Sequence, residues 1–155
     1  MQKVLLSISL FTVFFLFSCE EEENQISSQT TFDKEIFNLI NNHRLEIGLE
    51  AFEYSEVIWE QANQHSKDMA EGIVDFGHDG FSERIDNIQQ EIGGSSAAEN
   101  VAMGYSTAES VVNGWLSSDE HKQNIEGNYT HSAISAVKNN SGVYYYTQIF
   151  INLNK

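Results

Sequence analysis

The apolar residues of this chain change from a helical to an alternating spacing, and this change constrains the fold most. Segments 33–47 and 55–73 carry apolar stripes with the spacing of amphipathic helices. Segments 133–138 and 143–151 are instead rich in β-branched and aromatic residues, and residues 139–142 between them are typical of a hairpin turn. Helices followed by a hairpin indicate an α+β fold, with helices packed on an antiparallel sheet.

Glycine and hydroxyl residues predict where the elements begin and end. Gly48 is a candidate for the end of the first helix, and Ser55 is a candidate cap at the start of the second. Residues 76–80 contain two glycines and predict a loop, after which Ser82 can cap a short helix. Residues 106–109 have the spacing of a capping box and predict the start of another helix.

The first nineteen residues resemble a lipoprotein signal. One lysine precedes an apolar run over residues 4–17, which is too short for a comfortable membrane span and fits a secretory signal. The run ends in Leu-Phe-Ser-Cys, similar to the bacterial motif that is cut before a cysteine that then carries lipid. Cys19 is the only cysteine, so an intrachain disulfide and a cysteine zinc site are both excluded. The alternative is an uncleaved signal anchor with an incidental thiol.

This reading divides the chain into three parts. Residues 1–18 are the signal peptide, residues 19–31 are a lipidated and flexible tether, and residues 32–155 are the folded domain. Four glutamates at 20–23 resemble the surface-export signal of some bacterial lipoproteins, although a solvated spacer has the same composition. We therefore expect a protein outside the cytoplasm, anchored to a membrane by lipid and exposed at the surface if the export signal operates.

The charge balance excludes one class of partner. Lysine and arginine total 8 against 23 aspartates and glutamates, which gives a formal charge of −15. A nucleic-acid-binding protein needs a basic face, and docking to anionic lipid needs the same. We expect no nucleic-acid partner, and we expect membrane association through lipid alone.

The five histidines are the first candidates for chemistry. His65 lies on an apolar helical stripe and is expected to be a hydrogen-bonded core residue. His43 is expected to serve as a helix cap or in an ion pair, and His131 receives no role. His78 and His121 stand in segments bounded by glycine or serine and beside acidic residues, where side chains can point into a cleft. These two are candidate metal ligands or acid–base groups.

Glu99 is the candidate carboxylate. It lies between small apolar residues, so it is either exposed on a strand edge or buried with a partner. If it is buried it needs a cation or several hydrogen-bond donors, because an isolated buried carboxylate is very costly. A Ser–His–Glu triad stays open at this point, since serines are plentiful and spacing alone identifies none of them.

Several short segments together resemble the CAP superfamily, the SCP domain of cysteine-rich secretory proteins, antigen 5 and plant pathogenesis-related proteins. The resemblance is closest to the bacterial secreted branch, and it spans nearly all of the folded part in the order of the family. The matching segments are 41–44, 62–70, 77–81, 99–104, 111–118, 121–125, 128–130 and 146–150.

The resemblance implies a three-layer α-β-α sandwich with a central antiparallel sheet. It also implies a cleft lined by two histidines and two acidic residues, which in some members holds zinc or another divalent cation. Those four positions fall on His78, Glu99, His121 and Ser118. The serine stands where many members have glutamate, and Asp119 or Glu120 can take the place of that acid. Imidazoles and a carboxylate are suitable ligands for zinc.

Three functions follow from these residues. The first is non-enzymatic binding of a small molecule, lipid, glycan or peptide in the cleft. The second is hydrolysis, either metal-assisted or by a serine–histidine pair, as proposed for some relatives. The third is a structural or interaction role in the cell envelope. The resemblance favours the first, because the family shares a scaffold while its activities diverge and many are not catalytic.

Overall fold

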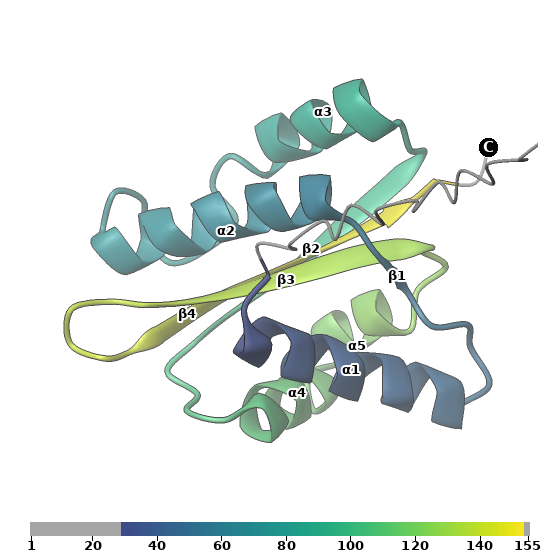
Figure 1. Cartoon of the computed structure of the whole chain (residues 1–155), viewed down its shortest axis with the longest axis horizontal. Helices are drawn as coiled ribbons and strands as arrows, with labels where there is room; N and C mark the ends of the chain where they lie inside the picture. Colours follow the sequence, from purple (N-terminus) through teal and green to yellow (C-terminus); the bar gives the residue numbers. More distant parts are fainter. Residues whose placement is uncertain (1–28, 154–155) are drawn as a thin grey trace, which may run out of the picture.

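The computed structural model describes residues 29–153, which form three layers with a sheet in the middle (Figure 1). Five helices and four strands lie within this described part. One face of the sheet is covered by α2 (Glu56–Glu71) and α3 (Phe81–Ile92). The other face is covered by α1 (Thr31–Glu46), α4 (Ala108–Leu116) and α5 (Asp119–Ile125). The strands are β1 (Glu53–Tyr54), β2 (Ser96–Met103), β3 (His131–Lys138) and β4 (Tyr144–Asn152).

The sheet has the strand order β1-β3-β4-β2 and is mixed. The hairpin of β3 and β4 is confirmed, and β2 pairs antiparallel with the other side of β4. The three long strands form the expected central antiparallel sheet, and the short strand β1 departs from it by pairing in parallel with β3 at Glu53 and Tyr54. Two residues are too few to show an alternating pattern, so the sequence carried no signal for β1. The expected α+β sandwich is otherwise confirmed.

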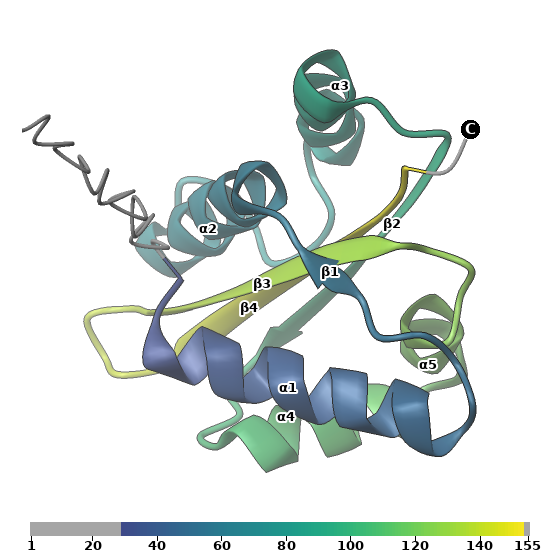
Figure 2. The same ribbon diagram turned by 45° about the vertical axis from the view of Figure 1, so that its right-hand side comes forward.

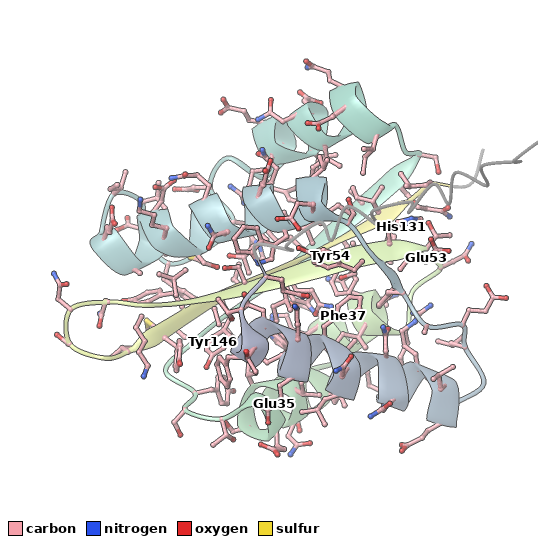
Figure 3. All side chains as sticks on the ribbon, in the orientation of Figure 1. Glu35, Phe37, Glu53, Tyr54, His131 and Tyr146 are labelled. Carbon is pink, nitrogen blue, oxygen red and sulfur yellow. The ribbon has the colours of Figure 1, made fainter. Side chains whose placement is uncertain are left out.

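The layer of α1, α4 and α5 holds the larger hydrophobic cluster. Phe37 and Tyr146, labelled in Figure 3, belong to it and lie between α1 and the sheet. Trp115 of α4 is also buried there, and its Nε1 donates to the Val101 carbonyl oxygen at 3.2 Å. Figure 2 shows α1 and α4 side by side below the sheet, with α3 standing on the opposite side. Apolar burial thus anchors this layer to the sheet.

The caps of the first two helices follow the sequence closely. Ser55 caps α2 through the amide of Ile58, and Gly72 ends it in the left-handed conformation with φ of 71°. Thr30 caps α1 in a reciprocal capping box with Asp33, so the helix begins at Thr31, two residues before the predicted start. Asp33 is fully buried and also accepts a hydrogen bond from the Ala136 amide. The start of α1 is thereby fixed to β3.

The prediction that Ser82 caps the third helix was wrong. A turn closed by the Phe81 amide and the His78 carbonyl precedes α3, and Gly80 is its N-cap residue with φ of 76°. A glycine tolerates this conformation, so the helix begins one residue before Ser82. The capping box of α4 also differs from the prediction by one residue, since Thr107 pairs with Ser110.

Strand β2 was not predicted, and it positions the candidate site. It is an edge strand built largely of small and polar residues, which give a weak strand signal. Alternation along β2 directs Glu99 to the face covered by α3 and Asn100 to the face covered by α5. Residues from both layers therefore meet at this edge.

The expected signal peptide and the lipid attachment at Cys19 lie outside the described residues. Within residues 29–153, no helix has the length and apolar character needed to cross a membrane.

Candidate functional site

Glu99 is buried, and an arginine compensates its charge. Only 1% of its side chain is exposed, and Arg84 of α3 donates hydrogen bonds to both carboxylate oxygens. The Arg84 Nε donates to Oε2 at 3.0 Å, and Nη2 lies 2.8 Å from each oxygen. A planar guanidinium in this arrangement can donate to both oxygens of a carboxylate at the same time. Of the two alternatives for Glu99, the buried one with a cationic partner is confirmed.

Arg84 also holds the loop before α3. Its Nη1 donates to the Asp79 carbonyl oxygen at 2.7 Å. Sequence reasoning missed this residue, although a signal was available: Arg84 is the only lysine or arginine between Lys67 and Lys122. A carboxylate buried in that stretch had few other cations within reach along the chain.

His78 lies in the loop held by Arg84, and it forms the exposed end of the polar chain. Its Nδ1 is 2.9 Å from Glu99 Oε1, and 53% of its side chain is exposed. A carboxylate accepts hydrogen bonds, so we assign the ring proton to Nδ1. Glu99 thereby fixes the orientation of the ring, and no hydrogen bond to its Nε2 is found among the described residues.

His121 reaches the same edge of the sheet from the opposite layer. Asn100 donates from Nδ2 to the His121 carbonyl oxygen at 3.1 Å, and Asn124 donates to the Asn100 side-chain oxygen at 2.9 Å. These bonds fix α5 to β2. Burial lowers the pKa of His121, and the nearby His78 lowers it further. Both effects favour a neutral imidazole at pH 7.

Ser118 is the N-cap residue of α5 and is half-buried. Its side chain makes no capping hydrogen bond, and its position is three residues before His121 on the same segment. Asp119 and Glu120 are exposed in the first turn of α5, where acidic residues stabilise a helix. The structure thus joins His78 directly to Glu99, and it brings His121 near them across the edge of β2.

The described residues do not fit a three-ligand metal site as they stand. Among residues 29–153, no group of three or more histidine, cysteine, aspartate or glutamate side chains is arranged to hold a metal ion. Both oxygens of Glu99 are already engaged by Arg84, and one of them also contacts His78. Zinc binding at His78, Glu99 and His121 stays a prediction of the sequence.

The other histidines have structural partners. His65 is 3% exposed and its Nε2 donates to the Gly77 carbonyl oxygen at 2.9 Å, which confirms the expectation of a hydrogen-bonded core residue. His43, expected in a helix cap or an ion pair, forms a hydrogen bond with Glu126, with 2.8 Å between its Nε2 and Glu126 Oε1. His131 begins β3 and lies 3.4 Å from Glu53 at the β1 end of the sheet (Figure 3).

The fold and this site define an α-β-α sandwich with a histidine–carboxylate cluster at the edge of its sheet. The sequence matches the CAP family of cysteine-rich secretory proteins over residues 37–150, and the chain belongs to this family.

Several bacterial proteins are similar to this chain in sequence. YkwD of Bacillus subtilis is 30% identical over 128 residues, which cover 81% of this chain and 49% of the relative. The chain therefore spans about half the length of that relative. An extracellular protein of Bacillus anthracis that contains an SCP domain is 28% identical with a TM-score of 0.64, over 77% of this chain and 39% of that structure.

A further structure shares the fold at lower identity. An outer surface protein of Borrelia burgdorferi has a TM-score of 0.70 and 20% identity, and the match covers 80% of this chain and 95% of that one. These two solved structures are thus an extracellular and a surface protein. The chain is thus a CAP-domain protein, and the proteins similar to it include bacterial extracellular and surface proteins.

Proposed function

We propose that the chain is a non-enzymatic ligand-binding module whose site consists of His78, Glu99 and His121. The observation that carries this proposal is the Arg84–Glu99–His78 chain of hydrogen bonds. These hydrogen bonds fix the orientation of the half-exposed His78 imidazole and do not involve its Nε2 atom. A rigid acceptor of this kind is suited to a ligand with an N–H or O–H group.

The partners of Glu99 favour binding over hydrolysis. In a catalytic triad the carboxylate supports the charge that the imidazole gains during the reaction. Here Arg84 already neutralises Glu99 and occupies both of its oxygens. The hydrogen bond identified at the His78 ring goes to the Glu99 carboxylate and not to a serine or threonine hydroxyl. These observations support a recognition role and leave hydrolysis without an identified nucleophile.

A ligand search with matched variants tests the proposal. The protein would be purified from its native cell envelope and analysed by native mass spectrometry for a bound small molecule, lipid, glycan or peptide. We expect a mass adduct on the wild type that His78→Ala and His121→Ala lose. His131→Ala is the control, because it removes a histidine at the other end of the sheet. An adduct retained by all variants, or absent from the wild type, would contradict the proposal.

Divalent-cation binding stays a separate prediction of the resemblance. Calorimetric titration with zinc tests it on the wild type, His78→Ala and His121→Ala. Equal weak binding by all three proteins would exclude a site at these residues. Loss of binding in both variants would support one.

We also propose that Cys19 anchors the module to a membrane through lipid. The support is the sequence alone: an apolar signal that ends at the only cysteine of the chain. The test is Cys19→Ser, followed by fractionation and mass analysis of the N-terminus. Loss of lipid and release from the membrane are expected, and a variant still processed and anchored would contradict the proposal.

A further inference from the structure

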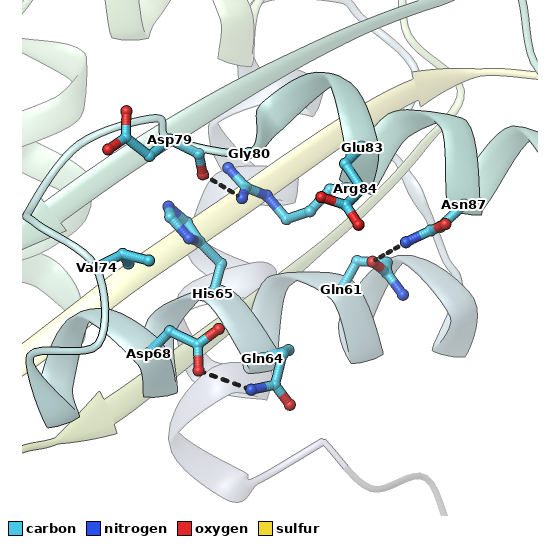
Figure 4. A pocket seen from close by; sticks show the side chains of 10 residues that line it. All are labelled: Gln61, Gln64, His65, Asp68, Val74, Asp79, Gly80, Glu83, Arg84 and Asn87. Carbon is cyan, nitrogen blue, oxygen red and sulfur yellow. Dashed lines mark hydrogen bonds between the residues drawn. The ribbon is translucent and has the colours of Figure 1, made fainter.

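Each histidine of the proposed site lies in a segment that an arginine holds in place. Arg84 donates to the Asp79 carbonyl oxygen and so holds the loop of His78, as the dashed line between the two residues in Figure 4 shows. His121 is the third residue of α5, a helix of seven residues. A helix this short is not stable by itself, so contacts with the rest of the chain decide where it lies. These contacts therefore decide where the His121 ring lies as well.

Arg44, in the last turn of α1, donates hydrogen bonds to the end of α5. Its Nη1 lies 2.7 Å from the Ile125 carbonyl oxygen and 3.0 Å from that of Gly127. Ile125 is the last residue of α5, and carbonyl groups at the end of a helix need donors from outside the helix. Ile125 follows His121 by about one helical turn. Arg44 thus acts close to the imidazole, although it belongs to the neighbouring helix (Figure 2).

The guanidinium of Arg44 is itself fixed in one orientation. Only 4% of the residue is exposed, and its Nε donates to the Glu50 carbonyl oxygen at 2.8 Å. The centre of the Phe52 ring lies 3.7 Å from Cζ, which is within the range of a cation–π contact. Asn41 holds Phe52 in turn, since it donates to the Phe52 carbonyl oxygen at 3.1 Å and accepts from the Phe52 amide at 2.8 Å. The bonds to α5 therefore come from a side chain that has little freedom to move.

Other contacts hold α5 against the sheet or at its surface. Asn100 and Asn124 attach it to β2, and the Ile125 side chain is fully buried in the larger hydrophobic cluster. A second bond from α1 joins His43 to Glu126, whose side chains are 21% and 29% exposed, so solvent weakens it. Apolar burial is not directional, whereas hydrogen bonds are. The buried bonds from Arg44 therefore add a directional constraint at the end of α5.

We propose that Arg44 is a positioning residue of the ligand site: its bonds to the end of α5 set the position of His121 at the edge of β2. This inference rests on the proposed role of His121 in ligand binding. The geometry requires an arginine, because Nε donates to Glu50 while Nη1 donates to α5. A lysine has the same charge, but all its donors are on one atom and cannot serve both places.

NMR and hydrogen exchange on the full chain with Arg44→Lys test the proposal. We expect the ring resonances of His121 to shift, whereas those of His65, under the other helix layer, keep their positions. The hydrogen-bonded amides of Lys122 and Glu126 in and after α5 should exchange about tenfold faster or more. Wild-type His121 resonances with wild-type exchange in α5 would overturn the proposal. Equal acceleration in α2 would show a loss of overall stability instead, and would overturn it too.

A second variant and a matched control separate the hydrogen bonds from the charge. Arg44→Met removes both, and should cause the same changes or larger ones. Lys34→Met is the control, because Lys34 is an exposed cation of the same helix; it should leave His121 in place and change exchange in α5 by less than about twofold. Equal changes in the two variants would overturn the proposal. Arg44→Lys keeps the charge, so it provides the test if Arg44→Met does not fold.

The positioning role and the ligand-binding role can fail separately. A wild type without a mass adduct contradicts the ligand-binding role, whereas the resonances of His121 and the exchange in α5 decide the role of Arg44 with or without an adduct. Where the wild type carries the adduct, Arg44→Lys should carry less of it than Lys34→Met in native mass spectrometry. Equal amounts in these two variants, together with a displaced His121, would overturn the proposal.

Discussion

The two faces of the sheet are stabilised by different kinds of contact. The face under α1, α4 and α5 has a cluster of thirteen buried apolar residues, whereas the face under α2 and α3 has eight. Both faces also bury polar side chains: Asp33, Arg44, Asn100, Ser132 and Gln148 on the first, and His65, Ser66, Arg84, Glu99, Ser135 and Thr147 on the second. Only on the second face, among the described residues, are two of these buried groups an ion pair, Arg84 and Glu99. We refer to the face under α1, α4 and α5 as the apolar face, because its apolar cluster is the larger, and to the face under α2 and α3 as the polar face, because it holds the buried Arg84–Glu99 pair.

This difference explains where the candidate site lies. Polar groups in a buried layer must satisfy one another, and this requirement fixes their orientations more strictly than apolar packing does. Glu99 and Asn100 are adjacent in β2, yet the first belongs to the polar face and the second helps to attach α5. The edge of β2 is therefore the place where residues of the two helix layers meet.

The largest expected effect is on the polar face. Arg84→Met leaves the Glu99 carboxylate buried without its cation, and we expect a loss of about 3–5 kcal/mol in the free energy of unfolding. Urea denaturation measures this loss. The double variant Arg84→Met/Glu99→Leu removes both charges and should recover most of it. A single variant that loses less than about 1 kcal/mol would show that the ion pair is not buried as described.

A cavity in the apolar face should cost a similar or smaller amount, without affecting the site. Ile134 is fully buried in the larger cluster, and Ile134→Ala is expected to cost about 2–5 kcal/mol. The His78 ring resonances should keep their wild-type positions, because the loss falls on the opposite face of the sheet. A change at His78 as large as that caused by Arg84→Met would mean that the two faces are not separable.

A single neutral hydrogen bond on the polar face should matter less. Ser66 Oγ lies 2.9 Å from Thr147 Oγ1 and 3.1 Å from the Ser135 carbonyl oxygen, all under α2. We expect Ser66→Ala to cost about 1 kcal/mol in thermal or urea unfolding. Ser82→Ala is the matched control at an exposed position and should change stability by less than about 0.5 kcal/mol. Equal effects in the two variants would contradict a polar network under α2.

The smallest expected effect is a pH dependence. Burial lowers the pKa values of His65 and His121 in the folded chain. The unfolded chain, with histidine pKa values of about 6.5, then binds more protons as the pH falls below that value. The free energy of unfolding should therefore be greatest above about pH 6.5 and decrease in more acidic solution. In His121→Asn the free energy of unfolding should decrease less steeply as the pH falls. The same pH dependence in the variant and the wild type would contradict the lowered pKa of His121 as its cause.

The sequence predicted the elements with strong local signals. The stripe of α2 and its cap at Ser55 were correct, as was the β3–β4 hairpin. Strands β1 and β2 were missed because one is two residues long and the other is built of small and polar residues that become a strand only by pairing with β4.

The candidate site was predicted in part. Glu99 and His78 were identified, and their contact is direct. Arg84 was missed because no regular spacing links a guanidinium to a carboxylate fifteen residues along the chain, and its being the only lysine or arginine between Lys67 and Lys122 was overlooked. The left-handed conformation of Gly80 shifts the start of α3 and so sets the direction of Arg84, which no periodicity reveals.

The protonation of the His78 ring tests the central claim most directly. Long-range proton–nitrogen NMR at about pH 8 distinguishes which ring nitrogen of each imidazole carries the proton. The account predicts the proton on Nδ1 for His78, held by Glu99, and on Nε2 for His65, held by Gly77. A proton on Nε2 of His78, or rapid averaging of its two forms, would contradict a ring fixed by the Arg84–Glu99 pair.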